Sequence, residues 1–163
     1  MNSPGNTDGL HARRSAFNDV SRMRGMLFDR LIAPHGITMS QAWLLTQLFI
    51  QDNQTQSELA VRMHIGTVAV GNTINRLEAQ GLVTRTTDSK DKRAKRIQLT
   101  KAAYPIGRAM RKCEKKVNKI SFGDVGAEEL EAMFATMFKI RKNLSDALEN
   151  GGTETPQKIR IVG

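Results

Sequence analysis

The sequence predicts a mainly α-helical protein with one small β-hairpin. Apolar residues recur at helical spacing along most of the chain, and two capping boxes mark helix starts near its centre. The stretches 82–86 and 95–99 are rich in alternating and β-branched residues and flank a polar loop, which is typical of a hairpin. A length of 163 residues favours one core with appended elements.

The capping boxes place two of the central helices. Thr38 with Gln41 opens a helix over about 39–51, and Thr55 with Glu58 opens a shorter one that ends near Met63. On the first of these helices, Ala42, Leu45, Leu48 and Phe49 form one apolar stripe, while Trp43 and Ile50 point the opposite way. We therefore expect both faces of that helix to be covered.

A third central helix follows a brief connection at 64–66 and runs to Gln80. Gly81 then stands where a left-handed helix stop is needed. Two short helices joined by a tight Gly-containing turn predict a helix-turn-helix unit. The core face of its second helix is Val70, Ile74 and Leu77.

Longer elements flank this unit on both sides. We expect a mobile tail over 1–11, a first helix over about 12–32 and, after a cap at Thr100, a helix with a kink or late start at Pro105. A last helix covers about 127–148. The predicted organisation is dimerisation helices in 12–37 and 101–150, a DNA-reading lobe in 38–100, and a C-terminal tail in 151–163.

The flanking helices carry more apolar surface than a small lobe can cover. The helix after the hairpin has a 4, 3, 4, 3 apolar spacing typical of a coiled-coil seam, and the last helix has a wide apolar face. We therefore expect packing against a second copy, with a monomeric helical bundle as the alternative. The residues assigned to dimerisation are Phe17, Val20, Ile106, Met110, Cys113, Val117, Leu130, Phe134, Met137 and Leu144.

Positive charge is concentrated in one segment. The whole chain has a formal charge of +9, whereas residues 84–121 hold thirteen Lys or Arg and three acids, a net +10. Such a distribution indicates a partner rich in phosphate, with a solvated basic face as the alternative.

The outward face of the third central helix suits the major groove of DNA. It is small, polar and nearly free of acids, with asparagines that can pair with adenine and an arginine that can pair with guanine or phosphate. Gly71 within it favours a close approach of the helix backbone to another helix or to DNA. An ordinary solvated face is the alternative. The residues assigned to DNA on this helix are Thr67, Val68, Ala69, Asn72, Asn75 and Arg76.

The hairpin tip adds a second basic surface. Its Lys90, Lys92, Arg93 and Arg96 are placed to reach phosphates or an adjacent minor groove. Asp91 is the exception, and we assign it the role of orienting Arg93 through a charge-assisted hydrogen bond, with an exposed ion pair of little value as the alternative.

Four stretches of the central lobe carry a specific pattern: TMSQAW (38–43), SELA (57–60), LEAQGLVTR (77–85) and DSKDKRAKRIQLT (88–100). Through them, about sixty residues resemble the MarR family of winged helix-turn-helix regulators. The resemblance implies a homodimer held by its first and last two helices, which binds a pseudo-palindromic DNA operator and releases it when a small aromatic or anionic effector binds. It also implies that Arg93 contacts DNA and that Asp91 orients it. Residues 66–69 and Gly71 depart from the family pattern, so base preferences do not transfer.

Effectors of the family bind between the dimerisation helices and the DNA-reading lobe. The residues here that suit an aromatic carboxylate are Met23, Arg24, His35 and Trp43, with ordinary packing between lobes as the alternative for each. Cys113 is flanked by lysines that favour a reactive thiolate, but its place in the apolar seam favours a buried, inert thiol.

Other classes of protein lack support in the sequence. One cysteine and three scattered histidines give neither a disulfide framework nor metal-ligand spacing, and we expect no metal or cofactor. No catalytic motif is present, so we expect no enzyme. Neither a membrane span nor a signal peptide is visible, and we expect a cytoplasmic protein. The competing hypothesis is a basic protein that binds nucleic acid without reading its sequence.

Overall fold

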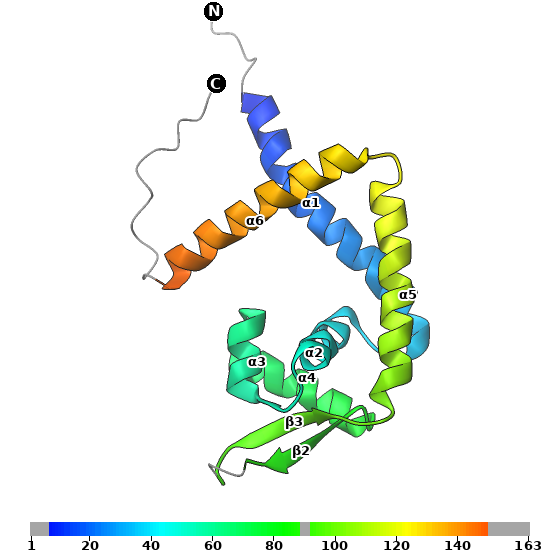
Figure 1. Cartoon of the computed structure of the whole chain (residues 1–163), viewed down its shortest axis with the longest axis vertical. Helices are drawn as coiled ribbons and strands as arrows, with labels where there is room; N and C mark the ends of the chain where they lie inside the picture. The colour runs from blue at the N-terminus through cyan, green and yellow to red at the C-terminus, as the bar shows by residue number, and fades with distance from the viewer. Residues whose placement is uncertain (1–6, 89–91, 150–163) are drawn as a thin grey trace, which may run out of the picture. The chain divides into compact units, whose positions relative to one another are not determined.

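The computed structural model describes residues 7–88 and 92–149, with side chains from Ser15 onwards. It is mainly helical with one small antiparallel sheet, which confirms the predicted fold class (Figure 1). The chain divides into two compact units, 1–121 and 122–163. In order, the elements are α1 (Thr7–Ile32), the short 3-10 helix η1 (Ala33–His35), α2 (Met39–Ile50), β1 (Gln54–Thr55), α3 (Gln56–Met63), α4 (Thr67–Ala79), β2 (Val83–Thr87), β3 (Lys95–Leu99), α5 (Ala103–Phe122) and α6 (Ala127–Glu149).

Both predicted capping boxes are confirmed. The Thr38 hydroxyl accepts from the Gln41 backbone N–H at 3.4 Å, and the Gln41 side chain accepts from the Thr38 N–H at 2.9 Å. Thr55 and Glu58 make the same reciprocal pair at 3.2 and 2.7 Å. Each box satisfies two N–H groups that have no partner within the helix, so α2 and α3 begin where the sequence places them.

The sheet has the order β1-β3-β2, with both pairs antiparallel. The hairpin β2–β3 was predicted, but β1 was not. β1 is only two residues long, and its buried Gln54 is polar, so no alternating pattern marks it. The Gln54 amide instead donates to the backbone carbonyls of Gln51 at 2.6 Å and Gln47 at 3.2 Å, which satisfies a polar group inside the core.

The core of residues 1–121 lies between α2, α3, α4 and the sheet. The predicted face of α4, Val70, Ile74 and Leu77, is fully buried there. Gly81 has a φ of 68°, as the left-handed stop after α4 requires. The main residues packed against this face from α2, α3 and β3 are Leu44, Leu45, Leu48, Leu59 and Ile97.

Two predicted boundaries differ from the structure. α1 begins at Thr7, so the expected tail over 1–11 is wrong for 7–11, while residues 1–6 and the tail 151–163 lie outside the described residues. Thr100 does not cap α5, because its hydroxyl donates to the Gly81 carbonyl at 2.6 Å. α5 starts late, at Ala103, which leaves Pro105 in the first turn, where a missing N–H breaks no helical bond.

The seam of α5 has a different role from the one predicted. Met110, Cys113 and Val117 are buried within this single chain, and Ile106 packs against the same core. Cys113 Sγ lies 3.4 Å from the Leu31 carbonyl oxygen of α1. The assignment of these four residues to contact with a second copy is therefore wrong: they hold α5 against its own unit.

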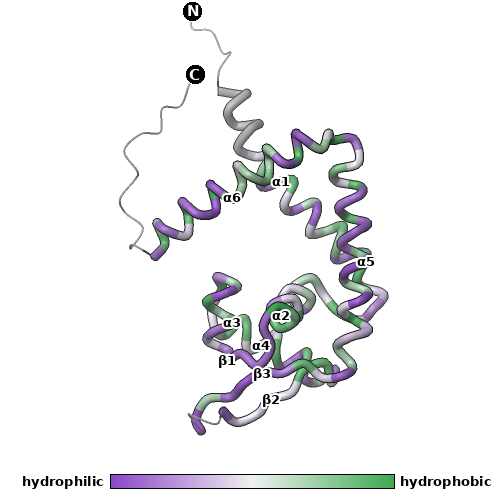
Figure 2. The backbone as a smooth tube through the Cα atoms, in the orientation of Figure 1, coloured by the Kyte–Doolittle hydropathy of each residue, from purple (hydrophilic) through white to green (hydrophobic). Residues whose placement is uncertain are grey.

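The second unit is built on α6, which has no buried residue. Figure 2 shows hydrophobic and hydrophilic residues alternating along this helix. Phe134 contacts Phe122 edge to face, with ring centres 5.8 Å apart, and the predicted residues Phe134, Met137 and Leu144 are exposed. Within the described residues, no helix is both long and apolar enough to cross a membrane.

The burial of one α4 face generates a test with a matched control. Val70→Ala removes two methyl groups from a side chain with 0% exposure, whereas Val68→Ala makes the same change at 75% exposure on the same helix. We expect Val70→Ala to lower the free energy of unfolding by about 2 kcal/mol and Val68→Ala to change it by less than about 0.5 kcal/mol. Urea denaturation measures both. Equal losses would contradict the orientation of α4.

Candidate nucleic-acid interface and ligand pocket

The outward face of α4 is as polar and open as the sequence predicts. All six residues assigned to DNA on this helix, Thr67, Val68, Ala69, Asn72, Asn75 and Arg76, are exposed. The opposite face of α4, with Val70, Ile74 and Leu77, is buried in the core, so these six side chains all point outward. A helix that offers short side chains outward can approach the floor of a major groove closely.

Gly71 explains how α4 lies against α3. A Cβ atom at this position would come within 2.7 Å of the Gln56 side-chain nitrogen. That nitrogen donates to the Thr67 carbonyl at 2.8 Å. The close approach expected at Gly71 is therefore to the Gln56 side chain of α3, and it braces the two helices of the helix-turn-helix unit.

One residue of the α4 face is tied to the hairpin. Arg85 of β2 donates to the Asn75 side-chain oxygen at 2.6 Å and forms an ion pair with Glu78. Local sequence patterns do not predict this arrangement, because Arg85 and Asn75 are on different elements and ten residues apart.

The tip of the hairpin is only partly described. The Asp88 N–H donates to the Ala94 carbonyl at 3.0 Å and closes the base of the loop. Lys92 and Arg93 are exposed beyond it, as predicted. Lys90 and Asp91 lie outside the described residues, so the orienting of Arg93 by Asp91 stays a prediction.

Arg96 does not lie on the exposed basic surface of the hairpin tip. It is half-buried, forms ion pairs with Asp88 and, at 3.5 Å, with Glu58, and donates to the Asn53 carbonyl at 2.8 Å. Its assignment to DNA is therefore wrong, because its guanidinium is used to join β3 to α3 and to the loop before β1. Pattern reasoning missed this role since Asn53 and Glu58 are about forty residues away in the chain.

The carboxylate of Glu58 is stabilised in its charged form. The Thr55 backbone N–H is the largest cause that lowers the pKa of Glu58, and the Thr55 hydroxyl and Arg96 add to it. Partial burial and the charge of Asp88 act in the opposite direction. The capping box and the Arg96 network thus share one carboxylate.

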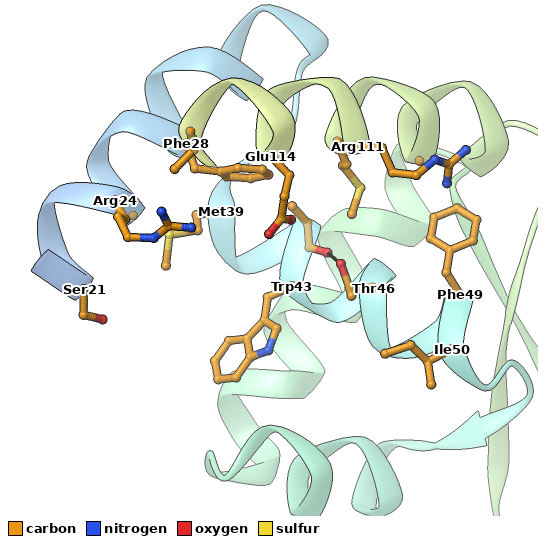
Figure 3. A pocket seen from close by; sticks show the side chains of 15 residues that line it. Ser21, Arg24, Phe28, Met39, Trp43, Thr46, Phe49, Ile50, Arg111 and Glu114 are labelled. Atoms are coloured by element: carbon orange, nitrogen blue, oxygen red, sulfur yellow. Dashed lines mark hydrogen bonds between the residues drawn. The ribbon is translucent and has the colours of Figure 1, made fainter. Parts of the chain in front are cut away.

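A cavity of about 580 Å³ lies among α1, α2 and α5 (Figure 3). Its walls are mainly apolar and include Phe28, Trp43 and Ile50, while Arg24, Arg111 and Glu114 supply charge. Gly107 allows α5 to lie close to α2, because a Cβ there would come within 2.6 Å of the Phe49 ring. A cavity of this size, apolar with a few charged groups, suits a small organic molecule.

The structure brings together two of the four residues predicted for an effector. Trp43 of α2 and Arg24 of α1 line the cavity, and Arg24 donates to the Asn118 side-chain oxygen at 2.7 Å. Met23 and His35 are exposed and do not line it, so placing them at this site was wrong. The sequence analysis missed the residues of α5 that line the cavity. The apolar periodicity of this helix marks its buried stripe and not the residues beside that stripe.

Comparison with known proteins supports the same fold. Residues 35–94 match the model of the MarR family. A MarR transcriptional regulator from Methanosarcina mazei Go1 aligns with a TM-score of 0.75 and 23% identity over 83% of this chain and 98% of that one. A mutant MarR from E. coli in complex with operator DNA aligns with a TM-score of 0.75 and 19% identity over 82% of this chain and 96% of that one. A probable transcriptional regulator from Pseudomonas aeruginosa aligns with a TM-score of 0.69 and 19% identity over 83% of this chain and 97% of that one.

The family match covers α2, α3, α4, β2 and the loop after β2, and it ends just before β3. This part of the chain carries the exposed α4 face and the basic tip. The structural alignments extend the likeness to the flanking helices. Residues 35–94 are therefore similar to the MarR family, and the chain shares the fold of solved MarR regulators.

Proposed function

We propose that the protein is a homodimeric transcriptional regulator that binds a pseudo-palindromic DNA operator and releases it when a small effector binds. The observation that carries this proposal is the exposed, acid-free face of α4 next to a hairpin with exposed cations. In this arrangement α4 enters the major groove, and Lys92 and Arg93 reach the neighbouring backbone or minor groove. The solved relative from E. coli bound to operator DNA supports this role by its fold.

The second copy is inferred from the second unit. α6 exposes a row of large apolar side chains at helical spacing, and a helix without a buried residue gains little from folding alone. A second copy of the chain would bury this row and place two α4 helices at a fixed separation, as a two-fold symmetric operator requires. The row consists of Met133, Phe134, Met137, Ile140, Leu144 and Leu148.

An effector in the cavity has a direct route to the DNA-reading helix. Trp43 and Met39 of α2 line the cavity, while Gln41 of the same helix donates to the Gln80 side chain at 2.9 Å, just after the end of α4. The Gln80 amide in turn donates to the Gly36 carbonyl at 2.7 Å. A ligand that shifts the start of α2 therefore also acts on the end of α4. Arg24 and Arg111 bring positive charge to this apolar cavity, beside the carboxylate of Glu114, and we expect an aromatic carboxylate as the ligand.

Two arginines of the hairpin make the DNA proposal testable. We expect Arg93→Ala to weaken operator binding about tenfold and to leave dimerisation intact, because its side chain is exposed on the hairpin. Arg96→Met is expected to lower the free energy of unfolding by roughly 2 kcal/mol, because it leaves the buried Asp88 without its guanidinium. Fluorescence anisotropy and urea denaturation measure the two effects.

The DNA in this test is the duplex upstream of the protein's own gene, with a scrambled duplex as competitor across a salt series. Lys139→Ala, which removes one positive charge from α6, controls for net charge. Unchanged affinity in Arg93→Ala would contradict the assignment of the hairpin to DNA. Equal affinity for both duplexes at every salt concentration would favour the non-specific binder instead.

The dimer proposal is tested on α6. Leu144→Glu places a charge in the apolar row, at a side chain with 60% exposure, and Asn143→Glu places the same charge on another side of the helix. We expect Leu144→Glu to raise the dimer dissociation constant at least about a hundredfold, because the charge would be buried at the interface, and Asn143→Glu to have little effect. Sedimentation velocity measures the association. A monomeric parent protein would contradict the proposal outright.

The effector proposal uses the single tryptophan of the chain, Trp43. Benzoate entering the cavity is expected to change the Trp43 emission and to lower DNA affinity in the same concentration range. Benzamide, which has nearly the same shape without the charge, should bind at least about tenfold more weakly, and Arg24→Met should remove this difference. Equal responses to both compounds would exclude the carboxylate as the recognised group.

A further inference from the structure

The contact between Asn75 and Arg85 fixes which way the asparagine amide faces. Arg85 Nη2 lies 2.6 Å from the Asn75 side-chain oxygen. A guanidinium has only N–H donors and no acceptor, so the asparagine must turn its oxygen, and not its amide nitrogen, towards Arg85. The chemistry of the pair therefore sets this orientation.

Arg85 is itself held in place. It lies on β2, where its backbone pairs with Ile97 of β3, and its second terminal nitrogen forms an ion pair with Glu78 of α4. Glu78 and Asn75 are three residues apart and so lie on neighbouring turns of one helix. The guanidinium thus bridges two positions of α4 from a strand, which restricts the rotation of the exposed Asn75 side chain.

We infer that Arg85 is a positioning residue that presents Asn75 to DNA as a hydrogen-bond donor, so that Asn75 favours guanine or thymine over adenine. The inference rests on the proposed function, in which α4 enters the major groove. It replaces the general expectation that an asparagine on this helix pairs with adenine through both of its amide atoms.

The reason is the distribution of donors and acceptors around the amide. Pairing with adenine needs the Asn75 oxygen to accept from the adenine amino group while its nitrogen donates to N7. Here one lone pair of the oxygen already accepts from a cation, and an amino group brought to the other would lie near the donors of Arg85. The amide nitrogen remains available: guanine offers it two acceptors, N7 and O6, and thymine offers O4, whereas adenine offers N7 alone, next to its own amino donor.

The experiment measures base preference and not only affinity. A duplex selected by the full-length protein from a random library is varied one base pair at a time in each half-site, and each version is competed against the parent duplex. The wild type is expected to prefer guanine or thymine over adenine by about fivefold at the position that loses its preference in Asn75→Ala.

Two further variants separate positioning from simple support. Asn75→Asp keeps an oxygen for Arg85 but replaces the outward donor with an acceptor, so the preference should switch to cytosine or adenine at that one position. Arg85→Met releases the Asn75 oxygen and should admit adenine there, while preferences at other positions stay the same. A merely structural role of Arg85 would weaken all duplexes equally. Because Asn75 is exposed, Asn75→Asp keeps the test valid even where Arg85→Met does not fold.

The outcomes are distinguishable. Selective binding in which Asn75→Ala alters no position, or alters one where adenine is preferred, would overturn the inference and leave the proposed function standing. If Asn75→Asp does not switch the base preference to cytosine or adenine, the inference is overturned as well. Wild-type protein that selects no sequence at all would overturn the proposed function, and the inference with it.

Discussion

The burial of one face of α4 is the constraint on which the rest of the arrangement depends. Val70, Ile74 and Leu77 are spaced so that all three enter the core formed with α2, α3 and β3. Their burial leaves α4 no freedom to rotate about its axis, so its remaining face is presented outward as one surface. The contacts of Gly71 with Gln56 and of Asn75 with Arg85 are possible only in this orientation.

Features that depend on neighbouring residues could be predicted from the sequence, and features that depend on distant ones could not. The capping boxes at Thr38 and Thr55 and the stop at Gly81 are local, and all three were correct. β1 is a strand only through its pairing with the distant β3. Arg96 binds Asp88, Glu58 and the Asn53 carbonyl, two of which are about forty residues away in the chain. The prediction for the apolar seam of α5 was wrong for another reason: the same spacing of apolar residues is found in helices that pack within a chain and in helices that pack between chains.

α2 connects the two candidate sites because it is covered on more than one side. Leu44, Leu45 and Leu48 enter the core, while Trp43 lies in the cavity wall on the other side. Gln41, with 5% exposure, joins the start of this helix to Gln80 after the end of α4. A buried side-chain amide is costly to leave without a partner, so a displacement of α2 favours a matching displacement of Gln80 over breakage of the bond. This link gives the cavity a mechanical connection to α4.

The charge of the basic segment divides into two classes that composition cannot separate. Residues 84–121 carry a net +10, but Arg85 and Arg96 are held by Glu78, Asp88 and Glu58 and serve the fold. Asp88 is already included in that count, whereas Glu78 and Glu58 lie outside the segment, so the count overstates the charge offered to a polyanion. Lys92 and Arg93 are exposed near the tip of the hairpin. The positive charge that the hairpin offers to a polyanion therefore depends on which of its cations are engaged within the fold, and not on their total.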